Sequence, residues 1–202
     1  MMRAAKGQTI QGFTLIELLI TMIIAGVLLS VAAPDFSDAI RNSRQRTITN
    51  ELMGSLKFAR SEAIKRSTRT TVCARGADNS CGSSWSQGHI VFLDNGATPG
   101  EIDDDEEILR LGTPVEQGFI LNRARLVNTS ESPLQRPFIR FGPRGTSHWR
   151  GSGFFVVCDN RGDDYARAIN ISLSGDPRRA RYNEANELIN SFGGPVSCNK
   201  GS

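Results

Sequence analysis

GFTLIELLITMIIAGVLLSVAA, residues 12–33, is the stretch that decides the fold of this chain. A short basic leader containing Arg3 and Lys6 precedes it, and the apolar run that begins at Phe13 contains a single carboxylate, Glu17. A helix of this length spans roughly 30 Å, the thickness of the hydrocarbon core of a bilayer. A charge there costs on the order of 3 kcal/mol, so Glu17 is expected to be functional and to need a partner.

Three interpretations of this segment compete. An ordinary single-span anchor would leave Glu17 unexplained. A secretory signal peptide has an apolar stretch of about 7–15 residues followed by a small-residue cleavage site. Here the apolar stretch is longer, and the small residue, Gly12, precedes it. The third interpretation rests on a resemblance of the residues around Gly12 and Glu17 to a known motif, and it is favoured.

Gly12-Phe13-Thr14-Leu15-Ile16-Glu17-Leu18 resembles the cleavage and assembly motif of type IV pilins and type II secretion pseudopilins. The resemblance implies that a prepilin peptidase removes residues 1–12 and methylates the Phe13 amine. It also implies that Glu17 pairs with the Phe13 amine of a neighbouring pilin subunit. The basic leader predicts a cytoplasmic N-terminus, hence one pass through the inner membrane and a periplasmic head before assembly into a pilus or pseudopilus.

The rest of the chain is long enough for one domain with its own core. We expect a leader at residues 1–12, a transmembrane and assembly half-helix at 13–33, an amphipathic soluble half-helix at 34–67 and a β-rich head at 68–202. Pro34 and Gly26 are points where the helix could bend. Apolar residues at helical spacing predict its core-facing stripe: Ile40, Ile48, Leu52, Leu56, Ala59 and Ala63.

Beyond about residue 69 the pattern changes to short β-branched or aromatic runs, most of them bounded by Gly, Pro, Asn or Asp. These runs predict an antiparallel sheet system behind the helix, an α+β fold. The predicted strands are residues 70–74, 89–93, 108–111, 138–141, 154–157 and 168–173.

Several motifs resemble, in the same order, those of the GspH/FimT family of minor pilins and pseudopilins. They include Leu56-Lys57-Phe58-Ala59-Arg60-Ser61-Glu62-Ala63-Ile64, Trp85-Ser86-Gln87-Gly88, Phe141-Gly142-Pro143-Arg144-Gly145 and Cys158-Asp159-Asn160-Arg161-Gly162. The resemblance implies a type IV pilin fold, in which a long N-terminal helix packs against a β-rich globular head.

Four cysteines lie outside the apolar segment, and translocation to an oxidising compartment predicts disulfides among them. Four cysteines allow three pairings. We favour Cys73–Cys81, which closes a short loop, and Cys158–Cys198, which ties the C-terminal tail to a strand.

No enzyme, cofactor or metal centre is predicted. The two histidines, His89 and His148, are too few for a typical tetrahedral metal site, and no nucleophile motif is present. The acidic segment from Asp94 to Glu107 could bind calcium, but it lacks the full spacing of an EF-hand. A solvated hairpin loop is the favoured interpretation.

Ser174-Gly175-Asp176-Pro177-Arg178-Arg179-Ala180-Arg181 follows a predicted strand and concentrates basic side chains. Family members associated with natural transformation carry Gly-Arg-x-Arg at this point and bind DNA with it. Gly175 and Arg178 match that motif, whereas Asp176 replaces its first arginine. The DNA-binding candidates are Arg178, Arg179 and Arg181, with Arg161 and Arg167 nearby in the sequence. The alternative is a solvated basic face or one paired with the acidic loop.

The sequence therefore predicts a non-enzymatic minor type IV pilin that primes or caps a pilus. Sequence-independent capture of double-stranded DNA for natural transformation is a second role. A minor pseudopilin of a type II secretion system is the alternative.

Overall fold

The structure is a computed structural model that describes residues 12–103, 105–125, 138–147, 153–190 and 193–198, without the side chains of 31–35 and 123–125. The chain forms two compact units, Met1–Arg41 and Asn42–Ser202. One helix, α1 (Leu15–Lys65), belongs to both units and continues through Gly26 and Pro34.

In the first unit, α1 carries apolar side chains that are half or more exposed, from Leu15 to Leu29. Its hydroxyl groups donate to carbonyls of the preceding turn: Thr21 to Leu18 at 2.8 Å and Ser30 to Val27 at 2.7 Å. Within the described residues, no helix combines the length and the apolar character that crossing a membrane requires.

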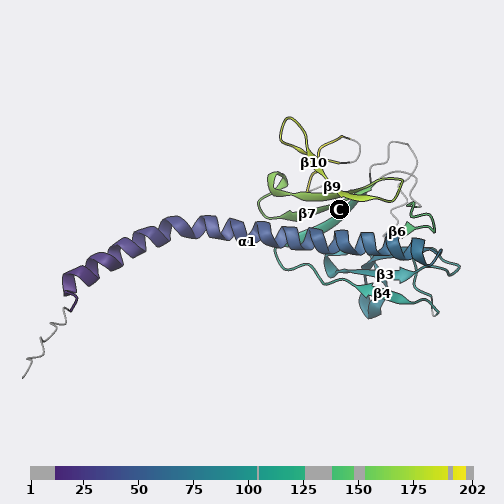
Figure 1. The fold of residues 1–202 in the computed structure, drawn as a ribbon, viewed down its shortest axis with the longest axis horizontal. Coiled ribbons are helices and arrows are strands. Elements are labelled where there is room, and N and C mark those ends of the chain that lie inside the picture. Colours follow the sequence, from purple (N-terminus) through teal and green to yellow (C-terminus); the bar gives the residue numbers. More distant parts are fainter. Residues whose placement is uncertain (1–11, 104, 126–137, 148–152, 191–192, 199–202) are drawn as a thin grey trace, which may run out of the picture. The chain divides into compact units, whose positions relative to one another are not determined.

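The second unit, which we call the head, contains two main antiparallel sheets and a small hairpin (Figure 1). The first sheet has the order β2-β1-β3-β4, and β6 also pairs with β1. Its strands are β1 (Thr70–Arg75), β2 (Cys81–Gly82), β3 (His89–Leu93), β4 (Ile108–Leu111) and β6 (Phe138–Phe141).

The second sheet has the order β5-β7-β8-β9, and β10 pairs with β11 in the hairpin. The strands are β5 (Phe119–Arg125), β7 (Gly153–Asp159), β8 (Arg167–Ile171), β9 (Pro177–Arg179), β10 (Arg181–Tyr182) and β11 (Leu188–Ile189). The described part of the head also contains three short 3₁₀ turns: η1 (Ala77–Asn79), η2 (Trp85–Gln87) and η3 (Asp163–Tyr165).

The part of α1 that belongs to the head packs against both main sheets, which lie on either side of it in Figure 1. Leu52, Leu56, Ala59 and Ala63 of the predicted stripe are buried in the main core. The ring of Trp85 meets that of Phe155 edge to face in the same core, with centroids 4.6 Å apart. Ile48 is partly buried beside this core, whereas Ile40 lies in the first unit and is exposed.

Strand β7 is buried on both faces, and its residues divide between two cores because side chains alternate along a strand. Phe155 and Val157 face the core under α1. Phe154, Val156 and Cys158 face a second core that includes Leu188 of β11 and Val196 of the C-terminal tail.

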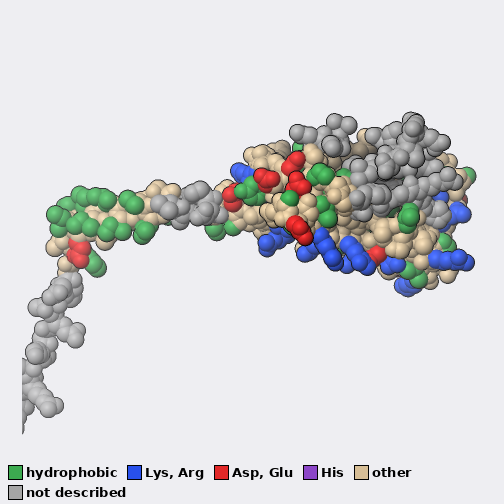
Figure 2. All heavy atoms as spheres, turned by 90° about the horizontal axis from the view of Figure 1, so that it is seen from above, with side chains coloured by type: hydrophobic (Ala, Val, Ile, Leu, Met, Phe, Trp, Pro, Cys, Tyr) green, Lys and Arg blue, Asp and Glu red, His purple; other side chains and the backbone are tan. Residues whose placement is uncertain are grey.

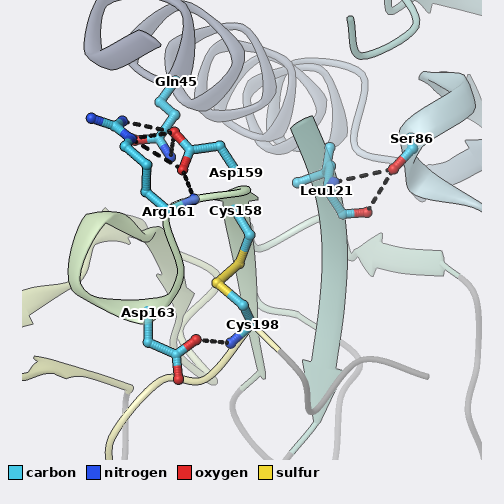
Figure 3. The surroundings of a disulfide bond; sticks show 8 residues. All are labelled: Gln45, Ser86, Leu121, Cys158, Asp159, Arg161, Asp163 and Cys198. Carbon is cyan, nitrogen blue, oxygen red and sulfur yellow. Dashed lines mark hydrogen bonds and ion pairs between the residues drawn. A yellow bond between two sulfur atoms is a disulfide. The ribbon is translucent and has the colours of Figure 1, made fainter. Parts of the chain in front are cut away.

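Both disulfides favoured from the sequence are present, Cys73–Cys81 and Cys158–Cys198. The second joins β7 to the tail, where the Cys198 amide also donates to the Asp163 carboxylate at 2.7 Å (Figure 3). The six predicted strands are all formed, whereas β5 and the short strands β2, β9, β10 and β11 were not predicted.

Candidate functional site

The N-terminal motif begins α1 with a partial capping arrangement. The Glu17 amide donates to the Thr14 hydroxyl at 3.3 Å, so Thr14 satisfies one of the free amides of the first turn. Phe13 is exposed, and the Glu17 carboxylate has no partner among the described residues. Gly12, Phe13 and Glu17 are therefore close in sequence and accessible.

The arginine turn, Ser174–Arg181, is anchored to α1. Gly175 has φ +76°, and a Cβ at this position would lie 2.1 Å from the Gly145 carbonyl oxygen, so the close approach of the two turns requires glycine. The same carbonyl accepts a hydrogen bond from the Arg60 guanidinium at 2.9 Å. Arg60 also donates to the Ser174 carbonyl at 3.5 Å. Arg60 in α1 and Gly145 after β6 thus position the turn that leads into β9, and both belong to motifs that resemble those of the GspH/FimT family.

Beyond Gly175 the chain forms β9, which is the edge strand of the second sheet and begins with Pro177. Proline is tolerated at an edge because it has no amide to donate to a further strand. An open groove of about 940 Å³ lies between α1, β9 and the β10–β11 hairpin. We call it the basic groove, and its charged side chains are Lys57, Asp176, Arg178, Arg179 and Arg181.

The basic groove contains four cations and one carboxylate, a net of three positive charges. Asp176 accepts a hydrogen bond from the Arg178 side chain at 2.6 Å and so partly neutralises it. Arg179 donates to the Asn50 amide oxygen at 2.6 Å, while Lys57 and Arg181 are exposed. Lys and Arg side chains gather along one edge of the head in Figure 2.

The structure does not bring Arg161 into the basic groove. Its guanidinium binds the buried Asp159 carboxylate at 2.7 Å (Figure 3). It also donates to the Asn42 side chain at 2.9 Å and stacks over the Tyr165 ring. Gln45 of α1 donates to the same Asp159 at 3.1 Å. Arg161 therefore helps to join α1 to the end of β7.

Arg167, the first residue of β8, lines a small separate cavity that Arg179 also lines. Lys57 and Asn50 of α1, in contrast, were not proposed for this site from the sequence. Both residues line the basic groove because α1 packs beside β9. In the sequence, the positive charge of Lys57 is the one signal that could have suggested a place in this groove.

Carboxylates of the acidic segment form hydrogen bonds within the head. Asp94 is fully buried and accepts hydrogen bonds from the Arg140 guanidinium, at 2.8 Å from Nε, and from the Gly100 amide at 2.9 Å. Glu106 accepts from the Asn95 and Gly96 amides, each at 2.7 Å. The described residues contain no group of three or more potential metal ligands, and His148 lies outside them.

Comparison with known proteins decides the family. The family model described as type II transport protein GspH matches residues 49–175, which is more than half of the chain. The chain belongs to the GspH family. The prokaryotic N-terminal methylation motif matches residues 2–33, which include Phe13 and Glu17. The resemblance inferred from the sequence is confirmed.

Two solved structures are similar to this GspH-family chain. The crystal structure of the type IV minor pilin FimU from Pseudomonas aeruginosa has 20% sequence identity and a TM-score of 0.52, covering 78% of this chain and 97% of that one. The minor pseudopilin EpsH from the type 2 secretion system of Vibrio cholerae has 11% identity and a TM-score of 0.46, covering 67% and 94%. No curated protein matches the sequence.

The predicted type IV pilin fold, a long helix with an antiparallel β-sheet head, is thus confirmed. The GspH family is a structural one, and its members act as minor pilins or pseudopilins. With the methylation motif, this makes the chain a membrane-anchored component of a pilus or pseudopilus that assembles with other pilin subunits.

Proposed function

We propose that this chain is a minor type IV pilin that primes or caps a pilus and captures double-stranded DNA in the basic groove. The observation that carries the DNA-binding step is the set of Lys57, Arg178, Arg179 and Arg181 around one groove with a single carboxylate, Asp176. Guanidinium groups bind phosphate oxygens with two parallel hydrogen bonds. Contacts to phosphates carry no sequence information, so the binding is sequence-independent.

Binding of this kind weakens steeply with salt, because each neutralised phosphate releases counterions. With about three or four phosphate contacts, the affinity should fall about 40- to 150-fold between 50 and 200 mM salt. This dependence distinguishes phosphate binding from apolar association.

The first prediction tests DNA binding at Arg178 and Arg181, which are two of the exposed arginines of the basic groove. We expect the double variant Arg178→Gln/Arg181→Gln to bind duplex DNA more weakly and to reduce the slope of log affinity against log salt by about two. The measurement is a gel shift with the full chain in a non-ionic detergent, across a salt series.

Arg69→Gln is the matched control, since Arg69 is exposed and lines none of the cavities described. Absence of binding by the wild type at low salt, or binding that salt does not change, would contradict DNA capture. Equal binding by the double variant and the wild type would exclude the basic groove as its location.

Assembly is proposed to depend on the N-terminal motif. The peptidase cleaves after Gly12 and methylates the Phe13 amine, and residues 13–33 hold the chain in the inner membrane as a single span. Glu17 then pairs with the Phe13 amine of the adjacent subunit. The apolar sequence, the methylation motif and the lack of a partner for Glu17 among the described residues support this proposal.

The second prediction tests that pairing. Glu17→Ala and Glu17→Gln should both be made and processed, yet both should be absent from sheared and purified filaments, because neither variant can neutralise the terminal amine in lipid. Immunoblotting measures incorporation, and mass spectrometry shows whether the N-terminus is methylated Phe13. Incorporation of either variant at the wild-type level would refute the role of Glu17.

A minor pseudopilin of a type II secretion system is the alternative function, and the description of the matching family favours it. Deletion of the gene separates the two functions. Loss of pilus-dependent motility supports the pilus, whereas loss of protein secretion supports the pseudopilus.

A further inference from the structure

A second basic site lies beside the basic groove, at a small cavity of about 50 Å³. Three arginines from different elements line it: Arg46 of α1, Arg167 at the start of β8 and Arg179 at the end of β9. Thr49 and Tyr182 add hydroxyl groups to its wall. No carboxylate is among the described residues that line the cavity.

Arg167 is the unusual member of this set. Its Nε atom is buried and has no hydrogen-bond partner among the described residues. Burial lowers the pKa of the Arg167 guanidinium, and the nearby charges of Arg46 and Arg179 lower it further. No carboxylate among the described residues forms an ion pair with Arg167, so its positive charge is not compensated within that part of the head.

Two described arginines of the head whose side chains are almost fully buried are compensated. Arg140 binds the carboxylate of Asp94, and Arg161 binds that of Asp159. A buried donor that lacks an acceptor destabilises a fold, and clustered like charges add to that cost. A bound anion would supply both the missing acceptor and the missing charge.

We propose that Arg46, Arg167 and Arg179 form a binding site for one phosphate group. Phosphate has four tetrahedral oxygens and can accept from guanidinium groups on three sides, whereas a carboxylate has two coplanar oxygens and a smaller charge. A water molecule needs about 10–15 Å³ of such a cavity, so about 50 Å³ suits a single phosphate group but not a nucleobase.

The phosphate can be the free inorganic ion or part of a nucleic acid backbone. Arg179 and Asn50 line both the phosphate site and the basic groove, and the two side chains are hydrogen-bonded to each other. A backbone lying in the basic groove could therefore place one phosphate in this site. Phosphate binding itself does not require that the chain captures DNA.

The test is calorimetric titration of the full chain, in a non-ionic detergent at low salt, with inorganic phosphate. We expect saturable binding to the wild type, and affinity at least about tenfold lower for Arg167→Gln and Arg46→Gln. The exposed control Arg69→Gln should bind phosphate like the wild type. Acetate should bind at least about tenfold more weakly than phosphate.

Arg46 is exposed, so Arg46→Gln remains informative even if Arg167→Gln does not fold. Competition with a short duplex identifies the source of the phosphate. Displacement of the duplex by phosphate from the wild type but not from Arg46→Gln indicates a backbone phosphate, and binding without competition indicates the free ion. No saturable binding to the wild type, or unchanged binding to Arg46→Gln, would overturn the proposal.

The phosphate site and the DNA-binding function can fail separately. A chain that binds phosphate but not the duplex retains the site and loses the proposed function. If Arg46→Gln and the wild type bind the duplex equally and neither binds phosphate, the chain retains the proposed function and the phosphate site is excluded.

Discussion

His89, the first residue of β3, is a buried base whose charged form the head disfavours. Its side chain is 3% exposed, and Nε2 has no hydrogen-bond partner among the described residues. A Cβ on Gly112 would lie 2.2 Å from the His89 ring, so the two residues pack in direct contact. Burial lowers the pKa of His89 from 6.5 to about 4, partly opposed by the charge of Glu51.

This pKa shift predicts a loss of stability in mild acid. The unfolded chain binds the His89 proton near pH 6.5 but the folded head only near pH 4, so the contribution is complete above pH 6.5 and falls as the pH drops towards 4. The whole loss is about 3 kcal/mol. Urea titrations at several pH values give the free energy of unfolding. As the pH falls, this free energy should decline more steeply for the wild type than for His89→Gln. Parallel declines would show that His89 does not titrate as described.

At the scale of the element, Gly54 is an unfavourable residue in the part of α1 that belongs to the head. A Cβ at Gly54 meets no atom within 4 Å, so alanine can replace it without a clash. Because glycine costs a helix about 1 kcal/mol relative to alanine, we expect Gly54→Ala to raise the melting temperature by about 2–4 °C. Thermal unfolding monitored by circular dichroism tests this.

Gly112→Ala is the contrasting variant, since the added methyl group would clash with the His89 ring, and its melting temperature should fall. A melting temperature of Gly54→Ala at or below that of the wild type would contradict the prediction.

The elements that could be predicted from the sequence are those with strong local patterns. The helix and its buried stripe follow from apolar spacing, and the six predicted strands follow from dense β-branched or aromatic runs. Strand β5 was not predicted because polar and basic residues interrupt its sequence, FILNRAR. Strands β9–β11 have only two or three residues each, and pairing rather than local preference determines them.

The candidate site was predicted only where its residues lie close together in the sequence. Arg178, Arg179 and Arg181 are close in sequence and do line one groove. Lys57 joins them only through the packing of α1, which no local pattern specifies. Arg161 is also close to these arginines in sequence but lies outside the basic groove, because its guanidinium binds Asp159, two residues away.

At the scale of the whole molecule, the two disulfides should differ in their contribution to stability. Cys158–Cys198 closes a sequence separation of 40 residues, and Cys73–Cys81 closes one of 8. The loop-entropy relation assigns about 4 kcal/mol to the longer loop and about 2.5 kcal/mol to the shorter. The Cys158→Ala/Cys198→Ala variant should therefore lose more stability than Cys73→Ala/Cys81→Ala.

Urea titrations of the two double variants and the wild type give the comparison. An equal loss, or a larger loss for the shorter loop, would show that packing around the cysteines outweighs the loop entropy.

The bond between Cys158 and Cys198 also has a consequence for a protein exposed to proteases. Arg178, Arg179 and Arg181 lie inside the loop that this disulfide closes, where a trypsin-like enzyme would cut. A single nick there breaks the backbone, but the C-terminal fragment stays covalently attached to β7. The nicked chain therefore runs as one species on a non-reducing gel and as two after reduction.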